Sequence, residues 1–250
     1  MHDKTDCCPA ESSSNVERRT ALKAALSVAA LGLAGSVGGV ETAYAAALSK
    51  SERDKLTPDQ IIENLKQGNK RFRQGKMQPH DYLAQKRATA SGQYPAAVIL
   101  SCIDSRAPAE IILDTRIGDT FNARIAGNIA NEDLIGSLEF ACAAAGAKVI
   151  LVMGHTGCGA IKGAIDHVEL GELTGLLAKI RPAVDETQFA GDRSSKNDEF
   201  VDAVAKTNVR RTIDAIRKGS NVLAPMEKDG KVKLVGAMYH LNGGVVEFLV

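Results

Sequence analysis

The sequence has no tryptophan, and aromatic residues make up only 4% of its 250 positions. Proteins that bind single-stranded nucleic acids use aromatic side chains as stacking platforms, and this chain has few to offer. An excess of one charge is also missing, because 31 Lys and Arg stand against 30 Asp and Glu, for a formal net charge of +1. A nucleic-acid-binding domain usually has a strongly basic surface. Both absences argue against nucleic acid as a partner.

Strongly apolar runs are lacking as well, and the weakly apolar stretch 24–40 is diluted by glycine and alanine. A membrane-spanning helix needs about 20 mostly apolar residues, so we expect no stable membrane span. The stretch follows Arg18 and Arg19 and precedes the small-x-small cleavage site Ala43-Tyr44-Ala45. This order resembles a twin-arginine export signal; a retained anchor is the alternative. We expect residues 1–45 to be a cleaved signal peptide, read by the twin-arginine translocation machinery, that delivers a periplasmic protein.

Cysteine is scarce, and two of the five cysteines would leave with the signal peptide. The remaining three, Cys102, Cys142 and Cys158, cannot form a fully paired disulfide framework. In an oxidising compartment the simplest interpretation of Cys102 and Cys158 is a disulfide. Metal-bound thiolates are the alternative. The twin-arginine pathway carries folded proteins, often with their cofactor already inserted, so metal binding before export would protect such thiolates.

Short apolar runs alternate with helical patterns through the rest of the chain, which indicates βαβ units. We expect parallel strands at 96–101, 120–126 and 149–153, and their continuous apolar character suits a sheet covered by helices on both faces. The last two apolar runs predict strands joined by a turn at Asn242-Gly243-Gly244, near a sheet edge. The fold class is therefore α/β, with a mostly parallel central sheet flanked by helices and an antiparallel strand near the C-terminus.

Helix signals define the start of the domain and its later elements. Thr57-Pro58-Asp59-Gln60 combines an N-cap, a proline at the first helical position and a capping-box glutamine. Asn131 should cap a helix that runs to about Ala145. Further helices are expected from about 159, at 172–180 and at about 200–216, with a polar loop at 188–197. We therefore expect a flexible lead-in at 46–56 and a single catalytic domain at 57–250.

Two motifs place thiol, imidazole and carboxylate groups at predicted strand ends. Cys102, Asp104 and Arg106 form a CxDxR unit after the first strand, and His155 and Cys158 form an HxxC unit after the third. Because the carboxyl ends of parallel strands meet at one edge of a sheet, these side chains should lie close together. Two thiolates and one imidazole leave a fourth zinc position open, as in catalytic zinc sites. Asp104 and Arg106 then stand beside that position; an ordinary ion pair capping a turn is the alternative.

The two motifs, CIDSR at 102–106 and HTGCGAIKG at 155–163, resemble the CxDSR and HxxCG signatures of the beta-class carbonic anhydrases. The resemblance extends over most of residues 57–250, including the terminal VGAMYHLNGGVVEFL. It implies an enzyme that reversibly hydrates carbon dioxide to bicarbonate and a proton by means of zinc-bound hydroxide. It also implies a homodimer or homotetramer with the metal site near the subunit interface.

The same resemblance assigns roles to the residues of the two motifs. Cys102, His155 and Cys158 correspond to the ligands of one Zn²⁺ ion per chain, and Asp104 with Arg106 corresponds to the catalytic dyad. In some family members the aspartate displaces the zinc water at lower pH. How firmly Arg106 holds Asp104 decides whether it can do so here.

Substrate-site residues follow from the family pattern by counting along the chain. Gln93, Phe121 and Phe140 match a glutamine, a phenylalanine and a tyrosine of plant-type members, and Phe140 lacks the tyrosine hydroxyl. Core packing is the alternative interpretation of the two phenylalanines, since each also fits a buried face. Ala126 should leave more room than the valine of the plant-type pattern, and the backbone N–H of Gly159 is expected to face the site. Phe140 and the helix from Thr57 are also the candidate subunit contacts.

Two other functions fit the same sequence features. A hydrolase of the same fold could act on carbon disulfide or carbonyl sulfide, and nothing in the predicted pocket excludes it. A zinc-binding sensor or structural protein without turnover is the second alternative. A purely structural site would favour a fourth cysteine or histidine ligand, so Asp104 and Arg106 speak against it.

Overall fold

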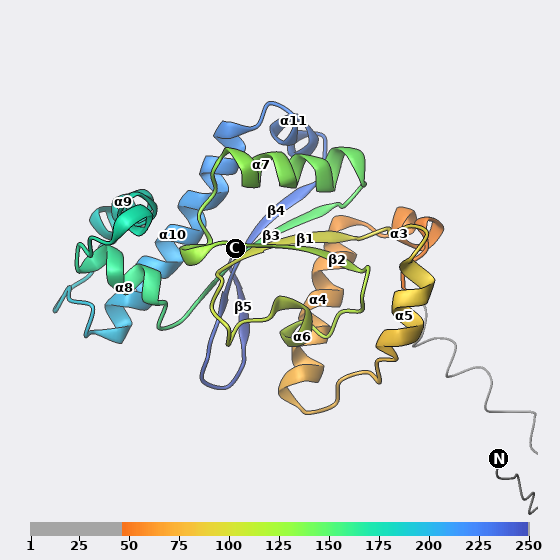
Figure 1. Cartoon of the computed structure of the whole chain (residues 1–250), viewed down its shortest axis with the longest axis horizontal. Helices are drawn as coiled ribbons and strands as arrows, with labels where there is room; N and C mark the ends of the chain where they lie inside the picture. Colours follow the sequence, from red (N-terminus) through yellow and green to blue (C-terminus); the bar gives the residue numbers. More distant parts are fainter. Residues whose placement is uncertain (1–46, 250) are drawn as a thin grey trace, which may run out of the picture. The chain divides into compact units, whose positions relative to one another are not determined.

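The structure is a computed structural model that describes residues 47–249 (Figure 1). Its centre is a five-stranded sheet with the strand order β2-β1-β3-β4-β5. The strands are β1 (Ala97–Ser101), β2 (Thr120–Arg124), β3 (Val149–His155), β4 (Lys233–Tyr239) and β5 (Val246–Leu249). Strands β2, β1, β3 and β4 are parallel, and β5 runs antiparallel to β4 at the edge. The expected α/β fold is confirmed.

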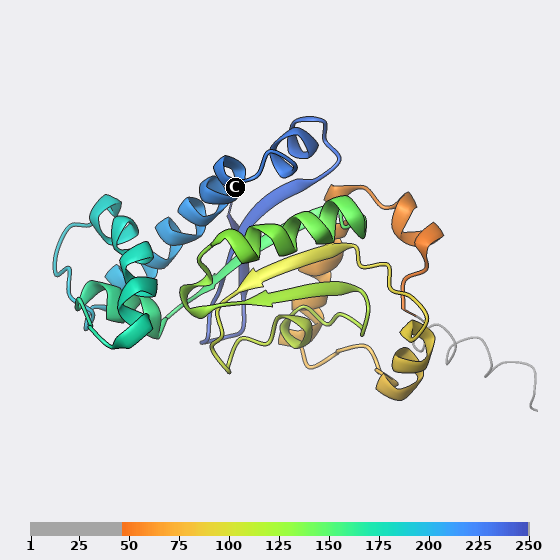
Figure 2. The same ribbon diagram turned by 45° about the horizontal axis from the view of Figure 1, so that its top comes forward.

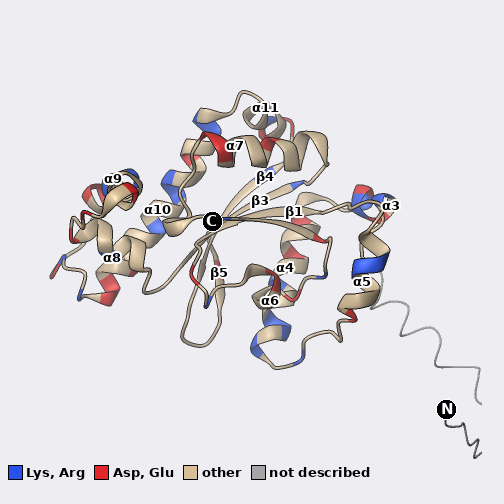
Figure 3. Ribbon diagram, in the orientation of Figure 1, with Lys and Arg blue, Asp and Glu red and all other residues tan. Residues whose placement is uncertain are grey.

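Helices cover both faces of the sheet, as Figures 1 and 2 show. The helices are α3 (Lys50–Lys55), α4 (Pro58–Arg73), α5 (Tyr82–Thr89), α6 (Ala109–Ile112), α7 (Glu132–Glu139), α8 (Gly159–Ile165), α9 (Gly171–Glu186), α10 (Asp198–Gly219) and α11 (Leu223–Lys228). On one face, α4 and α6 pack against Ile99 and Leu151. On the other, α7, α8, α9 and α10 pack against Leu100 and Val152. Charged residues lie mainly on the helices, and the strands are mostly uncharged (Figure 3).

Two helix starts follow directly from local sequence. Thr57 Oγ1 accepts from the backbone N–H of Gln60 at 3.2 Å, and Gln60 Oε1 accepts from the Thr57 N–H at 2.9 Å. Asn131 Oδ1 accepts from the Leu134 N–H at 3.0 Å and begins α7. After Glu139 that helix continues as a π-helical turn over Phe140–Ala144. Each cap satisfies a backbone donor that has no partner within its helix.

Two strands differ in length from the expected ones. The strand expected at 120–126 ends at Arg124, because Ala126–Asn128 forms a 3₁₀ turn in which Gly127 has a φ of 67°. The strand expected at 149–153 continues to His155, whose backbone pairs with Tyr239 of β4. Both differences lie at the carboxyl edge of the sheet. They bring the 3₁₀ turn and His155 to the same edge.

Of the expected flexible lead-in at 46–56, the described residues 47–56 are held by specific contacts. Its helix α3 begins with a capping box at Ser49, and Arg53 is only 5% exposed. Arg53 Nη1 donates to the carbonyl oxygen of Ala145 at 2.6 Å, and Lys148 Nζ donates to the carbonyl oxygens of Asp54 and Leu56. These contacts span about 90 residues of sequence, so local composition could not reveal them.

The expected signal peptide, residues 1–45, lies outside the described residues. Within residues 47–249, no helix is both long and apolar enough to cross a membrane.

Candidate metal centre

Three potential metal ligands come from two neighbouring strands and one helix start. Cys102 follows β1, His155 is the last residue of β3, and Cys158 is the N-cap of α8. Strands β1 and β3 are parallel neighbours, with Ser101 paired to Met153. The residues that follow this pair therefore meet at the carboxyl edge, where open α/β sheets place their sites.

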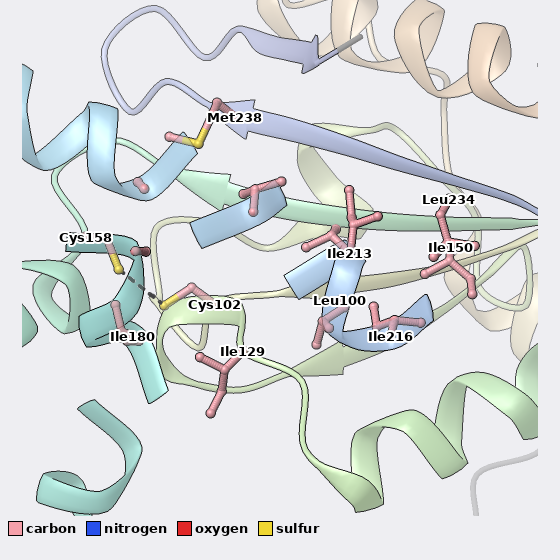
Figure 4. Close-up of a cluster of buried hydrophobic side chains, with 14 of the residues drawn as sticks. Leu100, Cys102, Ile129, Ile150, Cys158, Ile180, Ile213, Ile216, Leu234 and Met238 are labelled. Atoms are coloured by element: carbon pink, nitrogen blue, oxygen red, sulfur yellow. Dashed lines mark hydrogen bonds between the residues drawn. The ribbon is translucent and has the colours of Figure 1, made fainter. Parts of the chain in front are cut away.

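The donor atoms of Cys102, His155 and Cys158 all lie within 4.8 Å of one another, and all three residues are buried. The two Sγ atoms are 4.0 Å apart (Figure 4). A disulfide bond would bring them to about 2.0 Å, and both cysteines are free thiols. Tetrahedral zinc with Zn–S bonds of about 2.3 Å sets its sulfurs about 3.8 Å apart. The geometry fits a metal and contradicts the disulfide interpretation.

In the imidazole of His155, Nδ1 is hydrogen-bonded and Nε2 has no hydrogen-bond partner among the described residues. Nδ1 lies 2.9 Å from the carbonyl oxygen of Thr156, which can only accept, so Nδ1 carries the proton. In the neutral imidazole Nε2 then presents a lone pair, and this atom is buried with no hydrogen-bond partner among the described residues. Buried polar atoms nearly always have a partner. A metal ion bound by Nε2 would supply one, in the arrangement usual for histidine ligands.

The two thiols are electrostatically coupled. A hydrogen bond from Cys158, followed by contacts with His155 and the Gly127 N–H, lowers the pKa of Cys102 well below its ordinary value. The same hydrogen bond, together with burial, raises the pKa of Cys158 far above its ordinary value. The negative charge on one buried thiolate thus disfavours ionisation of the second thiol. A divalent cation would neutralise this charge repulsion and allow both thiols to ionise.

Asp104 and Arg106 form an ion pair at the edge of the ligand cluster. Arg106 Nη2 lies 2.7 Å from Asp104 Oδ2, and that oxygen is 3.8 Å from His155 Nε2. The hydrogen bond from the Arg106 side chain holds the pKa of Asp104 well below its usual range. Asp104 is therefore an ionised acceptor at neutral pH, close to one of the three donor atoms.

The carbonic anhydrase family model matches residues 97–246 of this chain. Carbonic anhydrase 2 of Mycobacterium tuberculosis is 34% identical over 188 residues, which cover 72% of this chain and 87% of that protein. The chain belongs to the beta-class carbonic anhydrase family. Among solved structures, the beta-carbonic anhydrase CafA of Aspergillus fumigatus matches with a TM-score of 0.59 and 27% identity, covering 76% of this chain and 88% of that one. A structure from a study of two tetrameric beta-carbonic anhydrases of Sordaria macrospora matches with a TM-score of 0.58 and 25% identity. The match covers 64% of this chain and 83% of that one.

In this carbonic anhydrase, residues outside the two motifs hold the loop that carries Asp104. Arg124 Nε donates to the carbonyl oxygen of Cys102 at 2.9 Å, and Arg124 Nη2 donates to that of Asp104 at 2.6 Å. The Gly127 N–H donates to Cys102 Sγ at 3.4 Å. On the second motif, Asp202 Oδ1 accepts from the Gly157 N–H at 2.9 Å. The sequence alone indicates no supporting role for Arg124, Gly127 or Asp202, because their partners lie 20 or more residues away along the chain.

A cavity of about 360 Å³ opens beside the cluster, and two predicted pocket residues line it. Ala126 and Gly159 lie in its wall together with Cys102 and Asp104. A Cβ added to Gly159 would meet no atom within 4 Å, which shows that the space beside it is open. Ala126 and Gly159 therefore lie beside the cavity next to Cys102, where the sequence led us to expect them.

The other three predicted pocket residues do not line this cavity. Gln93 is exposed and precedes β1, whereas Cys102 follows it, so the strand separates them by about 16 Å at roughly 3.3 Å per residue. The rings of Phe121 and Phe140 contact each other edge to face at 6.0 Å, and Phe140 is 58% exposed. Within a single chain, none of these three residues lines the cavity beside the metal ligands.

Proposed function

We propose that this chain catalyses the reversible hydration of carbon dioxide to bicarbonate and a proton, with one Zn²⁺ ion held by Cys102, His155 and Cys158. The observation that carries the proposal is the ionised Asp104 beside a buried three-donor cluster. Zinc, when bound, would supply Lewis acidity that brings the pKa of a water to about 7. A structural site with four protein ligands would need no such acceptor.

The chain's own groups supply orientation and charge. Arg106 fixes the plane of the Asp104 carboxylate through paired hydrogen bonds, so one oxygen faces the donor cluster. That oxygen can accept a hydrogen bond from the reacting water and turn its lone pair towards the substrate carbon. Arg124 keeps the loop in place by binding two of its carbonyl oxygens.

The cavity suits a small apolar substrate. Apart from Asp104 and Cys102, its wall consists of aliphatic side chains and glycine. Carbon dioxide has no net dipole and loses little by leaving water for such a surface. Carbon disulfide also has no net dipole, and carbonyl sulfide is small with only a weak one, so the test must compare all three directly.

The test is stopped-flow hydration of carbon dioxide by the zinc-loaded chain, alongside hydrolysis of carbonyl sulfide and carbon disulfide. The proposal expects rapid carbon dioxide hydration and much slower turnover of the sulfur compounds. Faster turnover of a sulfur compound would reassign the substrate. Zinc binding with no turnover of any of the three would favour a sensor.

We further propose that the chain works as a homodimer or homotetramer. Gln93, Phe121 and Phe140 lie away from the chain's own cavity, and Phe140 is exposed, as a subunit contact would require in a separated chain. The similar enzymes from Sordaria macrospora are described as tetrameric. Light scattering of the wild type and of Phe140→Asp tests this: the wild type should show two or four chains, and the variant a smaller assembly.

Export to the periplasm by the twin-arginine machinery is proposed from the sequence of residues 1–45. Because α3 is already anchored at Lys50–Lys55, cleavage near Ala45 would leave the described fold intact. Cell fractionation of the wild type and of a variant with Arg18 and Arg19 both changed to Lys tests it. The wild type should be periplasmic, and the variant should stay in the cytoplasm.

A further inference from the structure

The cavity beside the metal ligands is larger and more apolar than a triatomic substrate requires. Its volume of about 360 Å³ compares with about 30 Å³ for one water molecule in the liquid. Beyond Cys102 and Asp104 it continues between α8 and α9, where aliphatic side chains and glycine line it. We call this part the α8–α9 chamber; its wall is Ala160, Gly163, Val168, Leu173 and Leu177.

Gly163 keeps the chamber open. A Cβ at this position would lie 3.2 Å from Leu177 Cδ1 and 3.9 Å from Val168 Cβ. A larger side chain at Gly163 would therefore project between the side chains that border the chamber. Gly159, one helical turn earlier, faces open space at the metal end. Two glycines on one face of α8 thus leave a continuous path from the donor cluster to Leu177.

The two ends of the path differ in chemistry. At one end are Cys102, one of the three metal ligands, and the carboxylate of Asp104, whose charge is balanced by Arg106 at 2.7 Å. At the other end, Val168, Leu173 and Leu177 offer no hydrogen bond to water. Zn²⁺ bound by the three ligands would attract a compact anionic head to the first end, and an unbranched apolar tail that leaves water for the second end gains affinity with each methylene.

We propose that the α8–α9 chamber is a subsite for the tail of aliphatic monocarboxylates, whose head groups lie at the metal ligands. The head-group contact rests on the metal site of the proposed function; the tail contact rests on the chamber alone. Such anions would occupy the space in which substrate reacts. Medium-chain carboxylates are then competitive inhibitors, and Gly163 sets the tail length that the enzyme accepts.

The experiment is an NMR titration of the zinc-loaded chain with acetate, butanoate and hexanoate, which gives dissociation constants without turnover. Affinity should rise about fourfold per methylene, the equivalent of about 0.8 kcal/mol. Gly163→Leu should bind acetate like the wild type and lose the dependence on tail length. The matched control is Gly175→Leu on α9, where an added Cβ meets nothing within 4 Å; it should keep the dependence.

A second variant covers the case in which Gly163→Leu does not fold. Leu173→Ala, at a half-buried wall position, should extend the gain in affinity to octanoate. The proposal is overturned if affinity in the wild type does not depend on tail length, or if Gly163→Leu folds and keeps the wild-type dependence. A chain that shows the tail effect but hydrates no carbon dioxide would refute the proposed function and leave the chamber in place. An enzyme that hydrates carbon dioxide but whose affinity for carboxylates does not depend on tail length would refute the chamber proposal and leave the proposed function in place.

Discussion

Arg106 holds Asp104 with three hydrogen bonds. Its Nε and Nη2 donate to the two carboxylate oxygens at 2.9 and 2.7 Å, and its own backbone N–H donates to Oδ1 at 2.9 Å. The guanidinium is largely exposed, yet the carboxylate that it holds is 14% exposed at its side chain. The pair is therefore more than a surface ion pair, because it fixes an acceptor against a buried donor cluster. We expect an aspartate held in this way to resist turning onto the metal.

Replacing Arg106 by Lys tests this orienting role. Lys keeps the positive charge but cannot form the paired hydrogen bonds, so Asp104 should stay ionised and lose its fixed plane. We expect kcat for carbon dioxide hydration to fall about tenfold or more, within the range for a mispositioned acid–base group. Zinc content, measured by mass spectrometry, should not change. A wild-type kcat in Arg106→Lys would show that charge alone suffices.

Zinc should stabilise the fold through the three ligands. At free zinc near 100 times its dissociation constant, binding adds about 2.7 kcal/mol, which raises Tm by about 5–10 °C for a domain of this size. Calorimetry before and after chelation measures the difference. Cys158→Ser should abolish it. Cys142→Ala is the control: Cys142 is buried outside the cluster, burial raises its pKa to about 12, and its removal should leave the zinc effect intact.

Glu247 gives the β4–β5 hairpin an acid-sensitive link to α10. Its carboxylate accepts from Lys206 Nζ at 3.0 Å and from His240 Nε2 at 3.0 Å, and the Lys206 hydrogen bond, the largest cause, lowers the pKa of Glu247. The link therefore stabilises the fold above the ordinary pKa of about 4.3 and is lost as pH falls through the lowered value. Between about pH 5 and 3, Tm should fall less in Glu247→Gln than in the wild type.

Glu169 offers the matched control for that titration. It is exposed, and among the described residues it has no ion-pair partner. Glu169→Gln should follow the wild-type Tm curve at every pH. If Glu247→Gln follows that curve as well, the link contributes nothing measurable.

Gly127 should tolerate no side chain. Its φ of 67° is unfavourable for other residues, and an added Cβ would lie 2.5 Å from Ile180 Cδ1. Strain and overpacking together should lower the free energy of unfolding of Gly127→Ala by about 2–4 kcal/mol. Denaturant unfolding measures this. Gly175→Ala, on the open surface of α9, should instead be neutral or stabilising by up to about 1 kcal/mol.

Local signals in the sequence predicted the features that depend on neighbouring residues. The cap at Thr57, the cap at Asn131 and the strand ends that carry Cys102 and His155 all follow from patterns a few residues long. The position of α3 does not, because Arg53 reaches the Ala145 carbonyl 92 residues away. The support that Arg124 gives to the Asp104 loop is hidden for the same reason.

Ala126 and Gly159, expected at the site, line the cavity, whereas Gln93, Phe121 and Phe140, which came from counting along a family pattern, do not. Gln93 precedes β1 and Cys102 follows it, so one strand places them at opposite ends of the sheet. Phe140 fitted a buried helix face in the sequence, yet it is exposed where α7 gives way to a π-helical turn. Residues whose partner is another chain cannot be distinguished from core residues by periodicity.

Zinc K-edge absorption spectroscopy of the loaded chain at neutral pH can establish whether Cys102, His155 and Cys158 form an open zinc site beside Asp104. We expect two sulfur ligands at about 2.3 Å, one nitrogen at about 2.0–2.1 Å and one oxygen from water. A closed shell with a third sulfur or a second nitrogen, or a shell without sulfur because the thiols had paired, would contradict this expectation.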